Sequence, residues 1–357
     1  MTAAFGAAQA GASVQPISVM LVDDSAVVRG IISRGLANDP EIRVVGSAGD
    51  GKEALTLATS VKPEVVLLDV EMPVLGGLEA LPLLLRSLPG VTVIMASALT
   101  KRHAGLSLRA LEQGAADYVP KPDAADGEAG LARFFEELKL KIKAARRKPH
   151  AAPSRAAATR LVPGPGVKAV AIGASTGGPP VLLKIFSEAR GMIKTPVFIT
   201  QHMPPSFTET LAQQLGRAAN APACEPTDGQ AVEPGTIYVA PGGWHMIAQR
   251  DGARIVLHRS DAPPEHYCRP SVNPMLRSLS AVYREGLSVA ILTGMGSDGM
   301  EGCLAVADAR GRFVVQDEST SVVWGMPGAA FRTGRAKGAL PLAEMSAYLG
   351  LAMKGGL

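Results

Sequence analysis

Cysteine and aromatic residues are scarce in this chain of 357 residues, which has three cysteines and 4% aromatic residues. Cys224, Cys268 and Cys303 lie far apart and form no CxxC pair, which argues against a disulfide framework and a structural zinc site. A reducing, cytoplasmic compartment fits this cysteine usage. The first 22 residues carry no basic start and are interrupted by polar residues, Gly and Pro. We therefore expect no signal peptide and no membrane-inserted helix there.

Acidic residues are absent from one long stretch, 139–168, which carries nine basic residues. The whole chain has 36 Lys+Arg against 32 Asp+Glu, a net charge of +4. Outside that stretch the balance is reversed, because 27 basic residues face 32 acidic ones. The basicity therefore belongs to one segment and not to a folded face, so we expect no nucleic-acid partner.

Composition divides the chain into four parts. Residues 1–16 are expected to be a disordered Ala/Gly tail, and 146–166 a basic linker rich in Pro and Ala. Between and after them lie two blocks of ordinary domain size, 17–145 and 167–357.

The block 17–145 alternates apolar runs of strand length with stretches of helical periodicity. Continuous apolar runs separated by helices are typical of a parallel sheet that helices cover on both faces. The expected strands are 17–22, 43–46, 65–68, 91–95 and 118–119, and the block ends in an amphipathic helix over 130–146.

The block 167–357 shows the same alternation and predicts a second doubly wound α/β domain. Between Trp244 and His258, a Gln-Arg-Asp-Gly turn at 249–252 joins two apolar runs and indicates an added β-hairpin. Glycine is dense at the strand ends, where open α/β sheets place their sites. The expected strands are 168–172, 197–200, 236–239, 288–293 and 313–315.

Polar residues stand at the carboxyl ends of four expected strands in the first block. These ends meet at one edge of a parallel sheet, so their side chains can share one crevice. Carboxylates crowded together repel one another unless a cation neutralises them, and Mg²⁺ prefers such oxygen ligands. The residues at these strand ends are Asp23, Asp24, Asp69, Ser97 and Lys121.

This block resembles the receiver domain of bacterial response regulators, which has a flavodoxin-like fold. The resemblance implies that Asp69 accepts a phosphoryl group from a histidine kinase. It further implies that Asp23, Asp24 and Asp69, with the backbone carbonyl of Glu71, bind Mg²⁺. The residues that would sense phosphorylation are Ser97, Tyr118 and Lys121. One departure is a Gly76-Gly77 pair, where the family usually has Asp or Asn before a single glycine.

In the second block, Ser175 follows an expected strand in the turn Gly173-x-Ser175-x-Gly177. Small residues let the backbone bend sharply, and the helix that follows directs free N–H groups at a developing anion. The motif alone fits a nucleophilic serine or a glycine-rich anion-binding turn about equally well.

A serine nucleophile needs a base, and a histidine base needs an acid to fix its tautomer. Of six histidines, only His202 directly follows an apolar strand at the expected functional edge. Asp298 lies in a Gly-rich loop after another strand, although Asp-Gly is also a common turn signal. The order Ser, His, Asp differs from that of α/β-hydrolases, so that fold is not expected.

Four motifs in order, GASTGGP, QHMPPSFT, TGMGSDG and QDESTSVVWGMP, resemble the chemotaxis protein-glutamate methylesterases, which are also protein-glutamine deamidases. The resemblance implies a Rossmann-like catalytic domain in which Ser175 is the nucleophile, His202 the base and Asp298 its orienting acid. It also implies that Thr176 assists near the histidine and that the Met295 N–H contributes to an oxyanion hole. The chain departs from the pattern at Asn273, where Asp is common, and at Gly328, where Arg is common.

The resemblance implies a cytoplasmic, monomeric hydrolase that demethylates glutamate γ-methyl esters on chemoreceptors. It implies Mg²⁺ for phosphorylation and no cofactor for the esterase reaction. It also implies that the unphosphorylated receiver covers the catalytic cleft. Two alternatives stay open from the residues alone, a DNA-binding output and a nucleotide-binding α/β domain without hydrolysis. Against them, the second block predicts at least five strands and lacks the GxGxxG and P-loop signatures.

Overall fold

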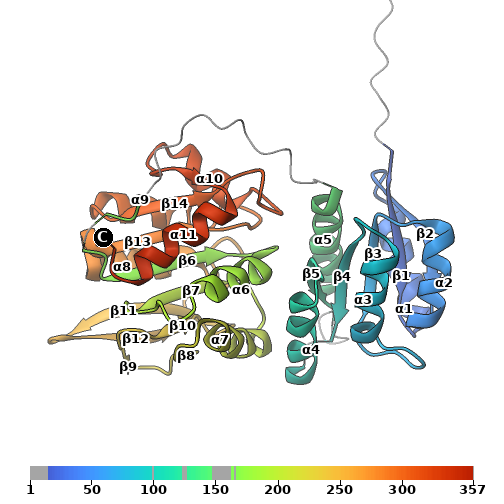
Figure 1. Cartoon of the computed structure of the whole chain (residues 1–357), viewed down its shortest axis with the longest axis horizontal. Helices are drawn as coiled ribbons and strands as arrows, with labels where there is room; N and C mark the ends of the chain where they lie inside the picture. The colour runs from blue at the N-terminus through green and yellow to red at the C-terminus, as the bar shows by residue number, and fades with distance from the viewer. Residues whose placement is uncertain (1–14, 99, 123–126, 147–161, 165, 357) are drawn as a thin grey trace, which may run out of the picture.

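The computed structural model describes residues 15–98, 100–122, 127–146, 162–164 and 166–356. In this part of the chain two α/β domains pack against each other (Figure 1). Nearly all of the expected tail and most of the expected linker lie outside the described residues. None of the described helices is both long and apolar enough to cross a lipid bilayer.

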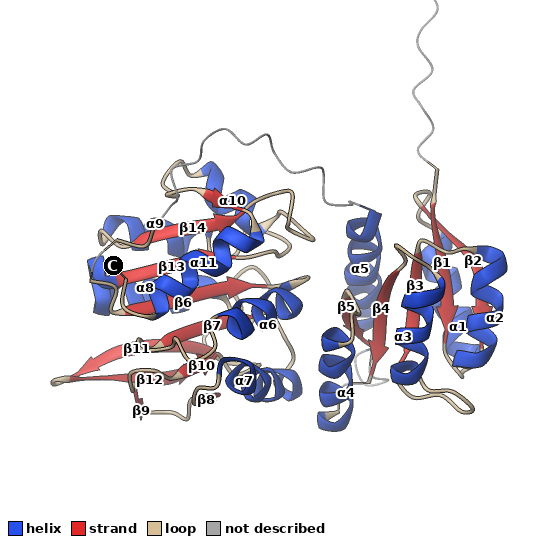
Figure 2. Ribbon diagram, in the orientation of Figure 1, coloured by secondary structure: helices blue, strands red, loops and turns tan. Residues whose placement is uncertain are grey.

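The first domain is a five-stranded parallel sheet, as the sequence predicts, and its strand order is β2-β1-β3-β4-β5. Helices lie on both of its faces (Figure 2). Its elements are β1 Ile17–Val22, α1 Ala26–Ala37, β2 Ile42–Ala48, α2 Gly51–Val61, β3 Val65–Asp69, α3 Gly77–Ser87, β4 Thr92–Ser97, α4 Lys101–Glu112, β5 Asp117–Pro120 and α5 Gly127–Arg146.

Alternation along β1 shows why both faces of this sheet are covered. Val19 and Leu21 pack with α1 and α5, whereas Met20 and Val22 point to the opposite face, toward α2, α3 and α4. Side-chain caps set where the first helices begin. Ser25 accepts a hydrogen bond from the N–H of Val28 at the start of α1.

The second domain is a seven-stranded parallel sheet in the order β15-β14-β13-β6-β7-β10-β8. A separate three-stranded sheet joins β11, β12 and β9. The elements are β6 Ala169–Ala174, α6 Gly178–Glu188, β7 Val197–Gln201, α7 Pro205–Ala219, β8 Ala223–Cys224, β9 Gln230–Ala231, β10 Ile237–Val239, β11 His245–Asp251, β12 Arg254–Ser260, α8 Val272–Tyr283, the 3₁₀ helix η2 Arg284–Gly286, β13 Leu287–Ile291, α9 Met300–Asp308, β14 Arg312–Gln316, α10 Met326–Arg332, β15 Ala339–Leu340 and α11 Leu342–Met353.

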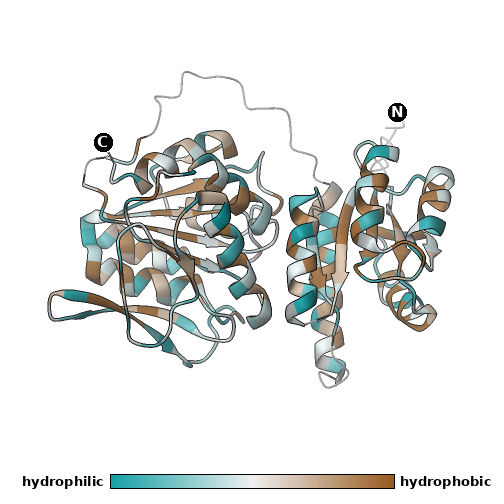
Figure 3. Ribbon diagram, turned by 60° about the horizontal axis from the view of Figure 1, so that its bottom comes forward, coloured by the Kyte–Doolittle hydropathy of each residue, from teal (hydrophilic) through white to brown (hydrophobic). Residues whose placement is uncertain are grey.

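The predicted hairpin is present as β11 and β12, but its turn is shorter than expected. Asp251 pairs directly with Arg254, so 249–251 continue the strand and the chain reverses at 252–253. The parallel sheet, with α6, α7 and α11 on one face and α8, α9 and α10 on the other, differs from a helical DNA-binding output. Figure 3 shows apolar strands inside both domains and mostly polar outer helix faces.

The two domains meet along α4, which packs against α6 and α7 (Figure 1). Tyr118 of β5 stacks on Phe207 of α7 with ring centroids 4.6 Å apart. The apolar layer under α4 continues into the layer formed by α6 and α7 as one buried cluster. The domain contact is therefore partly a hydrophobic core and not only a polar surface contact.

Candidate active site and phosphoacceptor site

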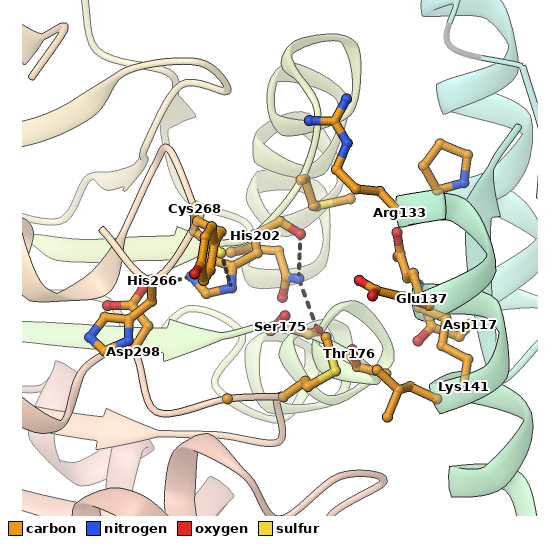
Figure 4. A pocket seen from close by; sticks show the side chains of 18 of the residues that line it. Asp117, Arg133, Glu137, Lys141, Ser175, Thr176, His202, His266, Cys268 and Asp298 are labelled. Carbon is orange, nitrogen blue, oxygen red and sulfur yellow. Dashed lines mark hydrogen bonds and ion pairs between the residues drawn. The ribbon is translucent and has the colours of Figure 1, made fainter. Parts of the chain in front are cut away.

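The three predicted catalytic side chains follow three adjacent strands, β13, β6 and β7. Ser175 follows β6, His202 follows β7, and Asp298 lies in the loop between β13 and α9. All three line one pocket of about 770 Å³, which we call the interdomain pocket because α5 and β5 of the first domain form its other wall (Figure 4). The structure thus brings together the residues that sequence spacing placed at one sheet edge.

The turn that carries Ser175 is held from several sides. Gly177 adopts a left-handed conformation, φ 74°, and a Cβ there would lie 2.6 Å from Val322. A glycine is therefore needed for both reasons. The backbone of Ser175 donates to the Thr293 carbonyl at 3.0 Å and accepts from the Gln201 amide at 2.9 Å. The nucleophile candidate consequently stands on a fixed backbone at the start of α6.

Asp298 is buried and has four hydrogen-bond donors around its carboxylate. His202 Nε2 and the N–H of Val272 each lie 2.7 Å from Oδ2. Ser271 Oγ, at 2.7 Å, and the N–H of Asn273, at 3.1 Å, donate to Oδ1. Burial alone would raise the pKa of Asp298, but His202 and the N-terminus of α8 lower it below its ordinary value. The acid is thus held ionised by the fold itself.

His202 is largely buried between two partners. Burial alone would lower its pKa, but the hydrogen bonds with Asp298 and with Cys268 raise the pKa to about 10. Cys268 Sγ lies 3.5 Å from Nδ1. Among the hydrogen bonds of the described residues, none joins Ser175 Oγ to His202. The raised pKa favours the protonated form of His202, whose two ring nitrogens face Asp298 and Cys268 in this arrangement.

The two predicted supporting residues also line the interdomain pocket. Thr176 is buried, and its carbonyl accepts a hydrogen bond from Thr293 Oγ1 at 2.9 Å. Met295 stands in the loop after β13 with 39% of its surface exposed. Their roles in assisting His202 and in the oxyanion hole stay predictions.

The two departures from the family pattern lie in the second domain's interior. Asn273 Oδ1 accepts from the N–H groups of Gly299 and Gly302 at 3.0 and 2.8 Å, and its Nδ2 donates to Glu301 at 2.7 Å. An aspartate here would place a like charge against Glu301. Gly328 is buried in α10, where a Cβ would lie 2.9 Å from Trp324. An arginine there would displace that ring.

In the first domain, oxygen atoms of Asp23, Asp24 and Asp69 lie within 4.8 Å of one another. Lys121 Nζ bridges two of them, at 2.6 Å from Asp23 Oδ2 and 2.9 Å from Asp69 Oδ1. Burial raises the pKa of Asp69, the charge of Asp23 adds to this, and Lys121 only partly offsets it. One lysine among three carboxylates leaves a net negative charge, so the donor set fits a hard divalent cation.

The remaining predicted receiver residues surround this cluster. Ser97 is buried at the end of β4, where its hydroxyl donates to the Ala98 carbonyl at 3.3 Å. The Glu71 side chain pairs with Arg102 at 2.7 Å and His103 at 3.0 Å. The role of the Glu71 carbonyl as a metal ligand stays a prediction. The backbone at Gly77 passes close to the Asp69 carbonyl, because a Cβ there would lie 1.9 Å from that oxygen, so a glycine is needed at this position.

The sequence did not predict a direct polar link between the two domains. Asp117 of β5 accepts a hydrogen bond from the N–H of Gly177, 3.1 Å away in the Ser175 turn. Lys141 Nζ lies 3.3 Å from Asp117 and 2.7 Å from Glu137, and it also donates to the Tyr118 carbonyl. Burial raises the pKa of Asp117 against the pull of Lys141. The receiver therefore holds the turn that carries Ser175.

Sequence reasoning also missed Cys268, Ser271 and Gln201. Each reaches the site through a loop or strand that is remote in sequence from its partner, with separations of 66, 27 and 26 residues. No motif spacing encodes such contacts. The one signal available was Ser271 with Asn273 at the beginning of an apolar helical run, which marks a helix start able to receive a carboxylate.

Together the acidic strand-edge cluster and the Ser, His and Asp pocket define a response regulator whose output domain has the layout of a hydrolase. Residues 19–128 match the response regulator receiver domain, and residues 170–349 match the CheB methylesterase domain. The chain belongs to the CheB methylesterase family.

Relatives and one solved structure agree with this assignment. A protein-glutamate methylesterase/protein-glutamine glutaminase 1 of Paramagnetospirillum magneticum is 44% identical over 93% of this chain and 95% of that relative. An Azospirillum brasilense relative with the same activities in its name is 43% identical over 94% of this chain and 92% of its own. The catalytic domain of Thermotoga maritima CheB methylesterase is 33% identical, with TM-score 0.50, and covers 51% of this chain and 97% of that one.

Proposed function

We propose that this chain is a phosphorylation-regulated serine hydrolase that removes the γ-methyl ester from glutamate residues of chemoreceptor cytoplasmic regions. The observation that carries the proposal is the interdomain pocket, in which Ser175, His202 and Asp298 follow three adjacent parallel strands. The names of the relatives, which match nearly the whole chain, support the ester and the amide as its two substrates.

In the proposed reaction, Ser175 Oγ attacks the ester carbonyl carbon while its proton passes to His202. The carbonyl oxygen becomes an oxyanion, and backbone N–H groups near Met295 would stabilise it by about 2.7–4 kcal/mol for a single donor. The ester C–O bond then breaks, and methanol leaves with the proton from His202. Water then attacks the carbonyl carbon of the acyl-enzyme while its proton passes to His202. The bond to Ser175 Oγ breaks as His202 returns that proton to Oγ, which releases the glutamate carboxylate. A glutamine would react in the same way and release ammonia.

Asp298 fixes the tautomer of His202 in this scheme. Its carboxylate accepts from Nε2, so the lone pair of neutral His202 is on Nδ1. Nδ1 is then the atom that takes the Ser175 proton. The resting contacts of His202 would have to change before it can do so.

The closed arrangement supports regulation by the receiver. Asp117 and Tyr118 of the receiver hold the catalytic domain through Gly177 and Phe207. Phosphorylation of Asp69 by a histidine kinase would favour an open arrangement of the two domains. The shift is as large as the free energy by which the phosphoryl group stabilises the open arrangement over the closed one. Mg²⁺ held by Asp23, Asp24 and Asp69 would neutralise charge at the phosphoryl group.

We place the reaction in the cytoplasm, with the histidine kinase and the chemoreceptor as protein partners, and we expect a monomer. No nucleic acid takes part in it. The acidic cluster around Asp69 supports the kinase, and the pocket supports a substrate that presents one extended side chain to Ser175.

The test is methanol release from a methylated chemoreceptor fragment. Ser175→Ala should lower the rate about 10⁶-fold, as expected for loss of a serine nucleophile. The matched control is Ser187→Ala, because that serine lies exposed in α6 and only donates to the Lys184 carbonyl. Undiminished methanol release by Ser175→Ala would refute the assignment of the nucleophile.

A further inference from the structure

Cys268 lies in the wall of the interdomain pocket, directly beside the catalytic histidine (Figure 4). It is half-buried, and its Sγ is 3.5 Å from His202 Nδ1. Its backbone exchanges hydrogen bonds with Glu265, and Glu265 is ion-paired with Arg277 of α8. The loop is thus tied to a helix of the domain, and the thiol has a defined position.

This contact occupies the nitrogen that the proposed reaction needs. His202 Nε2 is committed to Asp298 at 2.7 Å. Nδ1 is therefore the only ring nitrogen that can accept the Ser175 proton. In the part of the chain that the structure describes, Nδ1 faces Cys268 and makes no hydrogen bond to Ser175 Oγ.

We propose that Cys268 is a positioning residue that competes with Ser175 for the Nδ1 atom of His202. The thiol holds the ring in its resting place, and catalysis requires that Nδ1 exchange the sulfur for the serine hydroxyl. This inference rests on the proposed function and adds to it a second control of the base, within the catalytic domain and separate from the receiver.

The chemistry of the pair strengthens the competition. A thiol gives up its proton far more readily than a serine hydroxyl, so Nδ1 can take the proton from Cys268 and leave a thiolate beside an imidazolium. His202 then has no lone pair for Ser175. The contact with Cys268 is one of the causes that raise the pKa of His202. The other titratable or charged groups that line the pocket are Asp117, Tyr118, Arg133, Glu136, Glu137, Lys141, His266, Tyr267 and Asp298.

The other two cysteines provide a comparison within the same chain. Cys224 is half-buried in β8, where Gln230 Nε2 lies 3.6 Å from its sulfur. Cys303 is fully buried in α9, and burial raises the pKa of its thiol. Neither lines the interdomain pocket. Cys224 is therefore a matched control with similar burial and no contact with His202.

The kinetic experiment measures kcat/KM for methanol release against pH in the full chain. A base acts only when it is neutral, so kcat/KM rises through the pKa of His202. Cys268→Ser keeps the size of the side chain but holds its proton, and we expect the rise to move to lower pH. On the rising limb of the profile, a shift of one pH unit toward lower pH raises kcat/KM about tenfold at a fixed pH. Cys268→Ala should move the profile the same way and Cys224→Ser should not.

An unchanged profile in Cys268→Ser, with wild-type folding, overturns the proposal. A Ser175→Ala variant that still releases methanol, and stops after Cys268 is alkylated, would overturn it as well. Cys268 would then be the nucleophile and not a competitor for the base.

A second measurement is independent of ester hydrolysis. Iodoacetamide alkylates the thiolate, forming an S–C bond as iodide leaves, and mass spectrometry follows each cysteine. If His202 takes the thiol proton, His202→Gln should slow alkylation of Cys268 at pH 7 at least severalfold, with Cys224 as internal reference. Equal Cys268 rates in the two proteins would overturn the proposal. If wild type releases no methanol, the proposed function fails while this measurement still decides the contact.

Discussion

The two sites of this chain stand at the same place in two parallel sheets, yet they treat negative charge in opposite ways. Asp298 receives hydrogen bonds from the start of α8 and from His202, so the fold itself balances its charge. Asp69 shares one lysine with Asp23 and keeps a raised pKa. A catalytic carboxylate must stay ionised throughout the reaction. A phosphoacceptor needs a charge that a cation and a phosphoryl group can rearrange.

Within this comparison, removing the charge of Asp298 should have the largest effect on catalysis. Asp298→Asn keeps the shape but favours the wrong tautomer of His202, and we expect kcat for methanol release to fall about 10⁴-fold. Steady-state kinetics on a methylated receptor fragment measures it. Asp308→Asn is the control, because Asp308 is an exposed aspartate paired only with Arg335. A fall of less than tenfold would remove Asp298 from the mechanism.

Removing the phosphoacceptor Asp69 should leave the basal rate of methanol release intact and abolish its regulation. Asp69→Asn cannot accept a phosphoryl group, so a small-molecule phosphodonor with Mg²⁺ should no longer stimulate methanol release. Stimulation in wild type is expected at about 5–150-fold, the usual range of coupling between two sites. Stimulation that survives in Asp69→Asn would place the phosphoacceptor elsewhere.

Removing the hydrogen bond that joins the two domains should have a smaller effect. Asp117→Ala removes the acceptor for the Gly177 N–H, while Lys141 keeps Glu137 as its partner. Loss of a hydrogen bond to a charged group costs about 1.5 kcal/mol, so basal activity should rise about tenfold. Lys143→Ala is the control, since it breaks ion pairs with Asp39 and Glu41 inside the receiver. Equal basal rates for wild type and Asp117→Ala would show that this bond does not restrain the turn.

The smallest expected effect is on the stability of the fold. Removing the charge of Asp298 and removing that of Asp69 should change this stability in opposite directions. The pKa of Asp298 is lowered in the fold, so its charge stabilises the protein above the unfolded value near 3.9 and this is lost in acid. The pKa of Asp69 is raised, so its charge costs stability at neutral pH, and the cost disappears as pH falls through the raised value. At pH 7 Asp298→Asn should lower the melting temperature and Asp69→Asn raise it. Changes of the same sign would break the comparison.

Most of the fold follows from the sequence because both sheets are built from continuous apolar runs. The structure confirms that the predicted strands pair in parallel and that the hairpin is present, and it places all three catalytic candidates at one edge. The turn was predicted at 249–252 but lies at 252–253, because polar residues such as Arg250 also occur in exposed strands. Contacts of Cys268, Ser271 and Asp117 were invisible, since they depend on loop paths and on domain packing, which leave no periodic signal.

The stack of Tyr118 on Phe207 affects how the contact between the two domains depends on temperature. Separating the domains exposes these rings and the apolar layer around them, so opening must carry a positive heat-capacity change. Apolar contacts weaken on cooling, which favours the open form at low temperature. The basal rate of the full chain should then fall less steeply on cooling than that of an isolated catalytic domain. The chain would then lose part of the restraint by its receiver in the cold, when every chemical step is slower.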